Sequence, residues 1–339
     1  MSQKKIKKIL VTGTAGFLGS HLAEHLAKLG HTVVGIDNMI GGYEDNIPKN
    51  IKHFKIDCCD YEKINEIMKD VEIVYHCAAT AHEGLSVFSP FEITKNNYLA
   101  SVSIFSAAVN NKVKRIIFCS SMARYGGQKY PFDESMKPDP VDPYAISKVA
   151  AEKVLINLCE LNKIEWVIAV PHNIIGPRQK YDDPFRNVVS IMINRMLQGK
   201  APIIYGDGKQ TRCFSYIDDC LSCLIPMMDQ QNLNKEIINI GPDEEFVSIN
   251  KVAEICSNIT GVNLKPIYKK DRPQEVKHAV CSANKARALL NYKTKTSLLE
   301  GIKRTFDYIK TRGTKPFDYN IKIEINNELT PDTWKNKEI

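Results

Sequence analysis

The first half of this chain alternates short, continuous apolar runs with longer stretches that have helical periodicity. The runs are rich in valine and isoleucine and are too continuous for strands with one solvated face. They are typical of parallel strands that helices cover on both sides. This alternation, sustained over about 170 residues, predicts a doubly wound parallel sheet of the α/β class. The expected strands are KKILVTG, HTVVGID, IKHFKID, VEIVYHCAA, VKRIIFCSS and EWVIAVP.

The pattern loosens in the second half, where prolines interrupt the chain around one helical stretch, NVVSIMINRMLQGK. We therefore expect a second, smaller α/β domain and a tail. The tail contains one alternating stretch, NIKIEIN, which is either an edge strand or disordered. The expected parts are a large domain of residues 1–173, to which 214–242 returns, a smaller domain of 174–213 and 243–313, and a tail of 314–339.

The bulk composition argues against several classes of function. The formal net charge is +7, but the lysines are scattered apart from KKIKK, which is typical of a solvated surface rather than of a nucleic-acid partner. No apolar run reaches the roughly 18 residues of a membrane span, and the start has no apolar signal-peptide core. The 10 cysteines follow neither a disulfide nor a zinc spacing, which favours reduced thiols in a cytoplasmic protein without a metal.

A glycine-rich turn, TGTAGFLGS, follows the first expected strand. Gly13, Gly16 and Gly19 have the spacing that lets a backbone turn tightly and approach a pyrophosphate. The helix that begins near Phe17 offers its first amides to the phosphates. The turn therefore predicts a dinucleotide site of the Rossmann type.

Two aspartates follow the next strands. Asp37 ends the second strand, where a carboxylate accepts hydrogen bonds from an adenosine ribose and repels a 2′-phosphate. Asn38, not an arginine, comes next, so the expected cofactor is NAD rather than NADP. Asp57 ends the third strand and is placed either to hydrogen-bond the adenine or to cap the following helix.

A tyrosine and a lysine share one face of a later helical stretch. In DPYAISKVAAE, Tyr144 and Lys148 are four residues apart. A nearby ammonium group lowers the pKa of a phenol, so Tyr144 is a candidate acid and base near neutral pH. Two other Tyr–Lys pairs with this spacing contain glycines and are not expected to be helical. Ser120 and Ser121 end the fifth strand, at the edge where parallel sheets collect ligands.

Together these motifs resemble a known enzyme family. TGTAGFLGS, HCAA, SSMARYGG, YAISK, PHNIIGPRQ and YGDGKQTRCFSYIDD follow the order and spacing of the extended short-chain dehydrogenase/reductase family. More narrowly, they resemble its NAD-dependent sugar-nucleotide epimerase/dehydratase branch, of the UDP-glucose 4-epimerase type. The likeness runs from about residue 7 to 310. It implies an NAD-binding Rossmann domain, a nucleotide-sugar domain and a part in polysaccharide biosynthesis.

The resemblance assigns roles to individual residues. Ser121 would be the catalytic hydroxyl, Tyr144 the general base, and Lys148 its electrostatic partner and ribose ligand. The family has an asparagine in the helix that contains KNNYLAS; Asn97 resembles it, and Asn96 is an equally possible match. The residues expected to contact the cofactor are Gly13, Gly16, Phe17, Leu18, Gly19, Asp37, Asn38, Asp57, Cys58, Ala78, Ala79, Asn97, Tyr144, Lys148 and Pro171.

The resemblance also implies a nucleotide-sugar site. Arg212 and Arg272 match two arginines that clamp the diphosphate, a task for which forked guanidinium donors are suited; surface ion pairing is the alternative. Tyr205 would lie beside the base, and His82, in the AHEGLS loop, is either a substrate contact or an ordinary loop residue. The residues expected to contact the substrate are His82, Ser121, Asn173, Asn187, Tyr205, Arg212 and Arg272.

The residues after Ser121 narrow the implied reaction. In this family, 4,6-dehydratases carry Asp-Glu there, and decarboxylating and 3,5-epimerising members carry a glutamate or a cysteine at the second position. This chain has Met122 and Ala123, which move no protons. Removing a hydride and returning it to the other face needs none of those groups, so the resemblance implies 4-epimerisation through a transient 4-keto sugar. Ala279, near the position that gates the C2 substituent in this family, leaves room for an N-acetylated or otherwise enlarged sugar.

Other readings stay open. A dehydrogenase that releases the keto sugar, or a 2-epimerase, would carry the same residues. A catalytically silent NAD-binding protein would have a broken Ser–Tyr–Lys set, whereas this set is intact. Val170, Gln274 and Glu275 depart from the family's usual residues. The small and apolar faces of SVSIFSAAV and AISKVAAEKVLINL predict a homodimer.

Overall fold

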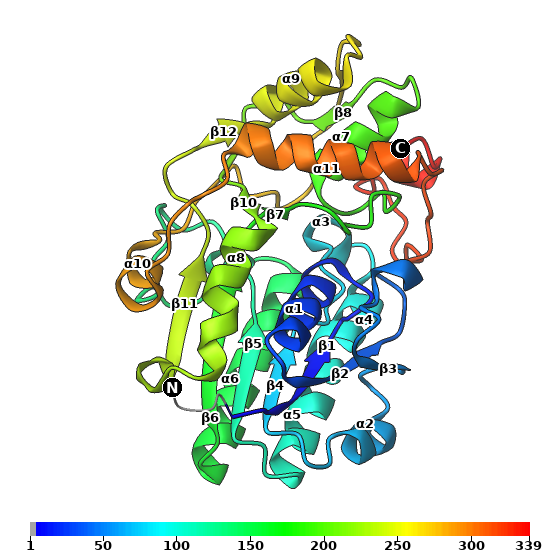
Figure 1. Ribbon diagram of the computed structural model, residues 1–339. Coiled ribbons are helices and arrows are strands. Elements are labelled where there is room, and N and C mark those ends of the chain that lie inside the picture. Colours follow the sequence, from blue (N-terminus) through cyan, green and yellow to red (C-terminus); the bar gives the residue numbers. More distant parts are fainter. Residues whose placement is uncertain (1–4) are drawn as a thin grey trace.

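The computed structural model describes residues 5–339; the first residue of KKIKK and the start of the segment tested for a signal peptide lie outside them. Seven parallel strands form one sheet in the order β11-β6-β5-β4-β1-β2-β3 (Figure 1). The order reverses between β1 and β4, where doubly wound sheets bind ligands. All six expected strands form, which confirms the fold class. The strands are β1 (Lys8–Thr12), β2 (Thr32–Asp37), β3 (Lys52–Lys55), β4 (Ile73–His76), β5 (Arg115–Cys119), β6 (Glu165–Pro171) and β11 (Glu236–Ile240).

Helices cover both faces of this sheet, because successive side chains of a strand point to opposite faces. Ile9 and Val11 of β1 pack on the face of α1 and α8, whereas Leu10 packs on the face of α2, α5 and α6 (Figure 1). None of the helices in residues 5–339 is both long and apolar enough to cross a membrane. The covering helices are α1 (Phe17–Lys28), α8 (Ile217–Leu224), α2 (Tyr61–Ile67), α5 (Ala100–Asn110) and α6 (Pro143–Asn162).

A second group of elements lies beyond the carboxyl ends of the strands (Figure 1). Its helices α7, α9 and α11 pack through an apolar cluster that includes Met192, Val252 and Ile302. The segment 214–242, between the two stretches assigned to this group, supplies α8 and β11 to the large sheet. The division into separate domains stays a prediction. The helices of this group are α7 (Val188–Leu197), α9 (Ile249–Thr260) and α11 (Leu298–Arg312), and the short strands are β7 (Ile174–Ile175), β8 (Ile203–Tyr205), β9 (Thr211–Arg212), β10 (Ser215–Tyr216), β12 (Val247–Ser248), β13 (Ile267–Lys269) and β14 (His278–Ala279). The helix α10 (Asn284–Leu290), from the stretch assigned to the smaller domain, lies instead beside β11 and packs on the large sheet (Figure 1).

The tail contradicts both expectations for it. NIKIEIN is neither an edge strand nor disordered; it packs irregularly along α3 (Glu83–Ser86) and α4 (Pro90–Thr94). The backbone amide of Glu324 donates to the carbonyl of Phe88 at 2.8 Å, and its carboxylate accepts the first two amides of α4, both at 2.9 Å. Ile321 and Trp334, the latter in α12 (Asp332–Lys335), join an apolar cluster with Leu85 and Phe88. In this stretch, Glu324 therefore caps the start of α4 and Ile321 packs into a small core, and no sheet edge forms.

Candidate active site

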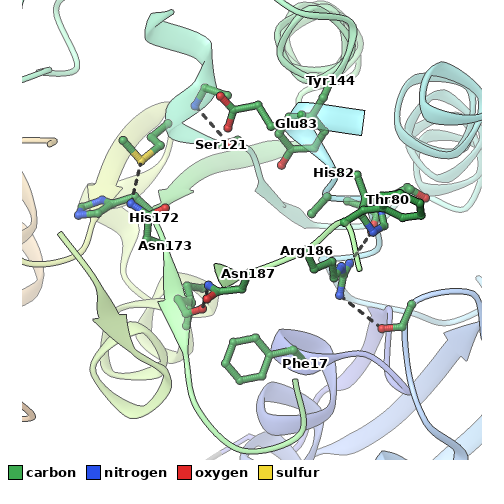
Figure 2. Close-up of a pocket in the computed structure, with 18 of the residues that line it drawn as sticks. Phe17, Thr80, His82, Glu83, Ser121, Tyr144, His172, Asn173, Arg186 and Asn187 are labelled. Carbon is green, nitrogen blue, oxygen red and sulfur yellow. Dashed lines mark hydrogen bonds between the residues drawn. The ribbon is translucent and has the colours of Figure 1, made fainter. Parts of the chain in front are cut away.

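A cavity of about 470 Å³ lies at the carboxyl ends of the sheet's strands (Figure 2). Its wall combines the turn after β1 and the ends of the neighbouring strands with residues of the smaller group of elements. Every residue predicted to belong to the site lines this cavity, with the exception of Asn97. The structure therefore brings the predicted cofactor and substrate residues together, although their individual roles stay predictions.

Asn97 and Asn96 face different ways. The side chain of Asn97 accepts the backbone amide of Thr80 at 2.9 Å and donates to its carbonyl at 3.1 Å, so it holds the loop after β4. Asn96 lines the cavity and donates to Glu92 at 2.8 Å. Both lie in a π-helical turn, Lys95–Leu99, which displaces side chains from their α-helical directions. Asn97 therefore holds the loop beside the cavity, and its contact with the cofactor stays a prediction.

The turn after β1 requires its glycines. Gly13 has φ +80°, and a Cβ on it would lie 3.1 Å from the backbone of Ala78. A Cβ on Gly19 would lie 2.2 Å from the carbonyl oxygen of Gly13, well inside contact distance. No side chain caps the first amides of α1, because the N-cap residue is Gly16. These amides are available to a pyrophosphate, so the residues present fit a dinucleotide.

Asp37, at the end of β2, and Asp57, just after β3, accept hydrogen bonds from neighbouring residues. Asp37 accepts two backbone amides, at 3.0 and 2.6 Å. Asp57 accepts the side chain of Asn38 at 3.2 Å and one backbone amide at 2.8 Å. Burial alone would raise the pKa of Asp57, but these hydrogen bonds bring it below its ordinary value. The N-cap of α2 is Asp60, so the capping alternative for Asp57 is wrong.

Tyr144 and Lys148 face the cavity from the first turns of α6, which begins where Asp142 accepts the amide of Ala145 at 2.9 Å. Burial raises the pKa of Tyr144 to about 12, and a hydrogen bond from Ser121 only partly opposes this. The ammonium group of Lys148 donates to the carbonyl of Cys119 at 2.9 Å, and burial lowers its pKa to about 8. The expectation that the ammonium lowers the pKa of Tyr144 is therefore wrong in this arrangement.

The two serines that end β5 have different surroundings. Ser120 donates to the buried carboxylate of Glu152, which also accepts Arg124 at 3.0 Å, so its hydroxyl is committed to the protein. Within residues 5–339, Ser121 accepts one backbone amide, that of Ala123 at 3.2 Å, besides its contact with the phenol. Ser121 is therefore the serine whose hydroxyl is available to a reacting oxygen (Figure 2).

Two arginines, Arg212 and Arg272, lie beside the carboxylate of Glu275 in the cavity wall. Arg272 donates to Glu275 at 3.1 and 3.0 Å, and its guanidinium group lies 4.8 Å from the ring centre of Tyr205. Arg212 lies 3.9 Å from the same carboxylate and donates to the carbonyl of Val276 at 2.7 Å. An ion pair exists, but it stands in the wall of the cavity rather than on an open surface.

The three remaining predicted residues have protein partners. His82 pairs through Nε2 with Asp183 at 2.7 Å, and both side chains are buried, which favours the reading of His82 as a structural loop residue. Asn187 caps α7 and donates to the carbonyl of Ile174 at 3.1 Å. Asn173 donates to the carbonyl of Cys213 at 3.0 Å.

Sequence reasoning missed Glu83 and Arg186, which line the cavity (Figure 2). Glu83 lies within the AHEGLS loop, so the unusual sequence of that loop was an available signal. Arg186 precedes α7 and points to the carbonyls of Gly41 and Ala79 at 3.4 and 3.5 Å. No local motif marks Arg186, because it reaches the cavity through the path of an irregular loop.

The sheet and the cavity define an enzyme of the extended short-chain dehydrogenase/reductase type. The chain belongs to the NAD dependent epimerase/dehydratase family, whose model matches residues 9–241. The predicted family and its NAD cofactor are thereby confirmed.

Individual relatives support the same placement. The chain is 36% identical over 309 residues to a putative UDP-glucose 4-epimerase of Methanocaldococcus jannaschii, covering 89% of this chain and 98% of that one. A UDP-N-acetylglucosamine 4-epimerase from Methanobrevibacter ruminantium, solved with UDP-N-acetylmuramic acid, has 31% identity, a TM-score of 0.84 and coverage of 91% and 100%. A UDP-glucuronic acid 4-epimerase from Bacillus cereus, solved with UDP-glucuronic acid and NAD, has 31% identity, a TM-score of 0.84 and coverage of 90% and 100%.

Proposed function

We propose that this protein is an NAD-dependent epimerase that inverts C4 of a nucleotide-diphosphate sugar, of the UDP-glucose or UDP-N-acetylglucosamine type. The observation that carries the proposal is the composition of one cavity wall. Ser121 and Tyr144 are both present there, while the neighbouring Met122 and Ala123 supply no second acid or base. The similar proteins named above are 4-epimerases.

In this proposal the chain's residues handle one proton and hold the substrate. NAD, when bound, supplies a hydride acceptor that returns the hydride. Tyr144 takes the proton of the C4 hydroxyl and gives it back, and Ser121 orients the oxygen. Lys148, on the same face of α6 as the phenol, holds the cofactor's ribose. Arg212 and Arg272 hold the diphosphate while the sugar turns between its two faces.

We further infer that the protein is a homodimer. Large apolar side chains lie exposed on and beside α5 and α6: Leu99 is 53% exposed and Ile146 is 52% exposed. Two such helices from each copy would bury these residues against each other. Sedimentation showing a monomer at micromolar concentration would contradict this inference. The cytoplasm suits the chain because all ten cysteines are free thiols, and the activity suits polysaccharide biosynthesis.

The two alternative enzymes differ from a 4-epimerase in their products. Purified protein with NAD is incubated with a panel of UDP-, GDP-, CDP- and dTDP-sugars, and the products are identified by NMR. The proposal expects interconversion of C4 epimers without net NADH. NADH that accumulates in proportion to substrate would indicate a dehydrogenase, and inversion at C2 would indicate a 2-epimerase. No reaction with any sugar would favour a silent NAD-binding protein.

A further inference from the structure

Glu83 is a carboxylic acid in the cavity that the proposed reaction does not use. It begins α3, in the loop after β4, and lines the cavity on the side of Tyr144 (Figure 2). Among residues 5–339, its side chain has no hydrogen-bonding partner. Glu83 is exposed on the cavity wall, so its carboxyl group is open to a molecule bound in the cavity.

The groups that act on Glu83 locate it between two ends of the site. The protein around the cavity raises the pKa of Glu83, the charge of Asp142 adds to this effect, and Arg212 and Arg272 oppose it. Glu83 in turn raises the pKa of Tyr144. A Cβ on the adjacent residue, Gly84, would lie 3.3 Å from the guanidinium group of Arg272. Glu83 therefore lies between the arginine pair and the phenol.

The sugar of the substrate has to span the same interval. In a nucleotide sugar, the hexose joins the diphosphate through C1. In the proposed function the arginine pair holds that diphosphate, and C4 of the hexose meets Tyr144. A side chain between these two ends faces the body of the hexose. The free carboxyl group of Glu83 is then next to the sugar's ring substituents.

We propose that Glu83 determines the class of sugar that this enzyme accepts. Its carboxylate accepts hydrogen bonds from hydroxyl or amide groups of an uncharged hexose and disfavours a uronic acid, whose carboxylate would face a like charge. Arg186, another cation of the cavity wall, has partners elsewhere: it lies 3.8 Å from Asp183 and donates to the carbonyls of Gly41 and Ala79. This inference rests on the proposed function. Since related 4-epimerases include a uronate enzyme and an N-acetylhexosamine enzyme, the fold alone does not decide the class.

The test compares the wild type with Glu83→Gln on UDP-glucose, UDP-N-acetylglucosamine and UDP-glucuronic acid. At about pH 8 the carboxyl group is mostly ionised, so the wild type should have kcat/KM for UDP-glucuronic acid about tenfold or more below that for the better neutral sugar. Glu83→Gln should reduce this difference in kcat/KM about fivefold, chiefly by raising kcat/KM for UDP-glucuronic acid. Glu62→Gln, an exposed change on α2, should leave the ratio as it is.

Either of two results would overturn the inference: a wild type that uses the uronate as well as neutral sugars, or an unchanged ratio in Glu83→Gln that retains NAD. A binding measurement removes the dependence on turnover and on the folding of that variant. Calorimetry on NAD-loaded Tyr144→Phe should show weaker binding of UDP-glucuronic acid than of UDP-glucose. If no sugar is turned over but UDP-glucose still binds more tightly than UDP-glucuronic acid, the proposed function fails and the preference for an uncharged sugar stands. Equal affinities for the two would refute that preference.

Discussion

Replacing Lys148 with methionine should stabilise the NAD-free protein at neutral pH. Lys148 is buried, and burial lowers the pKa of its ammonium group from 10.5 to about 8. Below pH 8 the ammonium is charged in both the folded and the unfolded chain, so folding carries the full cost of burying the charge. Between pH 8 and 10.5 the folded state releases its proton first and the cost disappears.

The size of the effect follows from the same pKa. A pKa lowered from 10.5 to about 8 corresponds to roughly 3 kcal/mol at pH 7. Methionine fills a similar volume but loses the hydrogen bond to the carbonyl of Cys119, which offsets about 1 kcal/mol. The net expectation is a gain of about 2 kcal/mol in the free energy of unfolding at pH 7, and no gain at about pH 10.5.

Urea unfolding of NAD-free wild type and Lys148→Met at the two pH values measures this difference. Lys153→Met, an exposed change on the same helix, controls for the loss of one lysine and should alter stability little at either pH. The reasoning would be refuted if Lys148→Met lowered the free energy of unfolding equally at both pH values. That result would mean that the ammonium group contributes contacts which outweigh its desolvation.

Three further substitutions test other parts of the site. Trp334, which is 2% exposed, packs against Tyr205 of the cavity wall with ring centres 6.2 Å apart. Trp334→Ala, at a local cost of about 3–5 kcal/mol, should therefore raise KM for the nucleotide sugar more than it lowers kcat. Leu329→Ala, 60% exposed in the same tail, should change neither. Gly19→Ala should abolish NAD retention during purification, because the added Cβ would lie 2.2 Å from the carbonyl oxygen of Gly13. NAD retained by this variant would refute the role of the glycine turn in binding the cofactor. Arg272→Lys should raise KM about tenfold in steady-state assays, since one ammonium cannot replace a forked donor, and an unchanged KM would remove Arg272 from the substrate site.

Features set by local sequence were predictable. The apolar runs of β1, β2, β4, β5 and β6 identified their strands because these are buried on both faces; β3, at the edge of the sheet, is only partly buried. The spacing of Gly13, Gly16 and Gly19 predicted a turn whose close contacts leave no space for side chains. The i, i+4 spacing of Tyr144 and Lys148 placed both on the cavity side of one helix.

Features set by distant contacts were not. The alternation in NIKIEIN resembles a strand, but Ile321 packs into a small core with residues far away in the sequence. The pKa of Tyr144 depends on burial and on neighbours such as Ser121 and Glu83, which spacing does not specify. Asn96 and Asn97 lie in a π-helical turn, in which Asn96 lines the cavity and Asn97 bonds the backbone of Thr80. Each of these outcomes depends on three-dimensional geometry that no short motif encodes.

The central claim is that the hydrogen on C4 leaves the sugar and returns to the same carbon on the other face. The most direct test uses a UDP-hexose carrying deuterium at C4, incubated in ordinary water, with the epimeric product examined by NMR. The account predicts that deuterium remains at C4 of the inverted product, without net NADH, and that Tyr144→Phe abolishes the exchange while retaining NAD. Deuterium lost to solvent, or NADH formed in proportion to product, would contradict it.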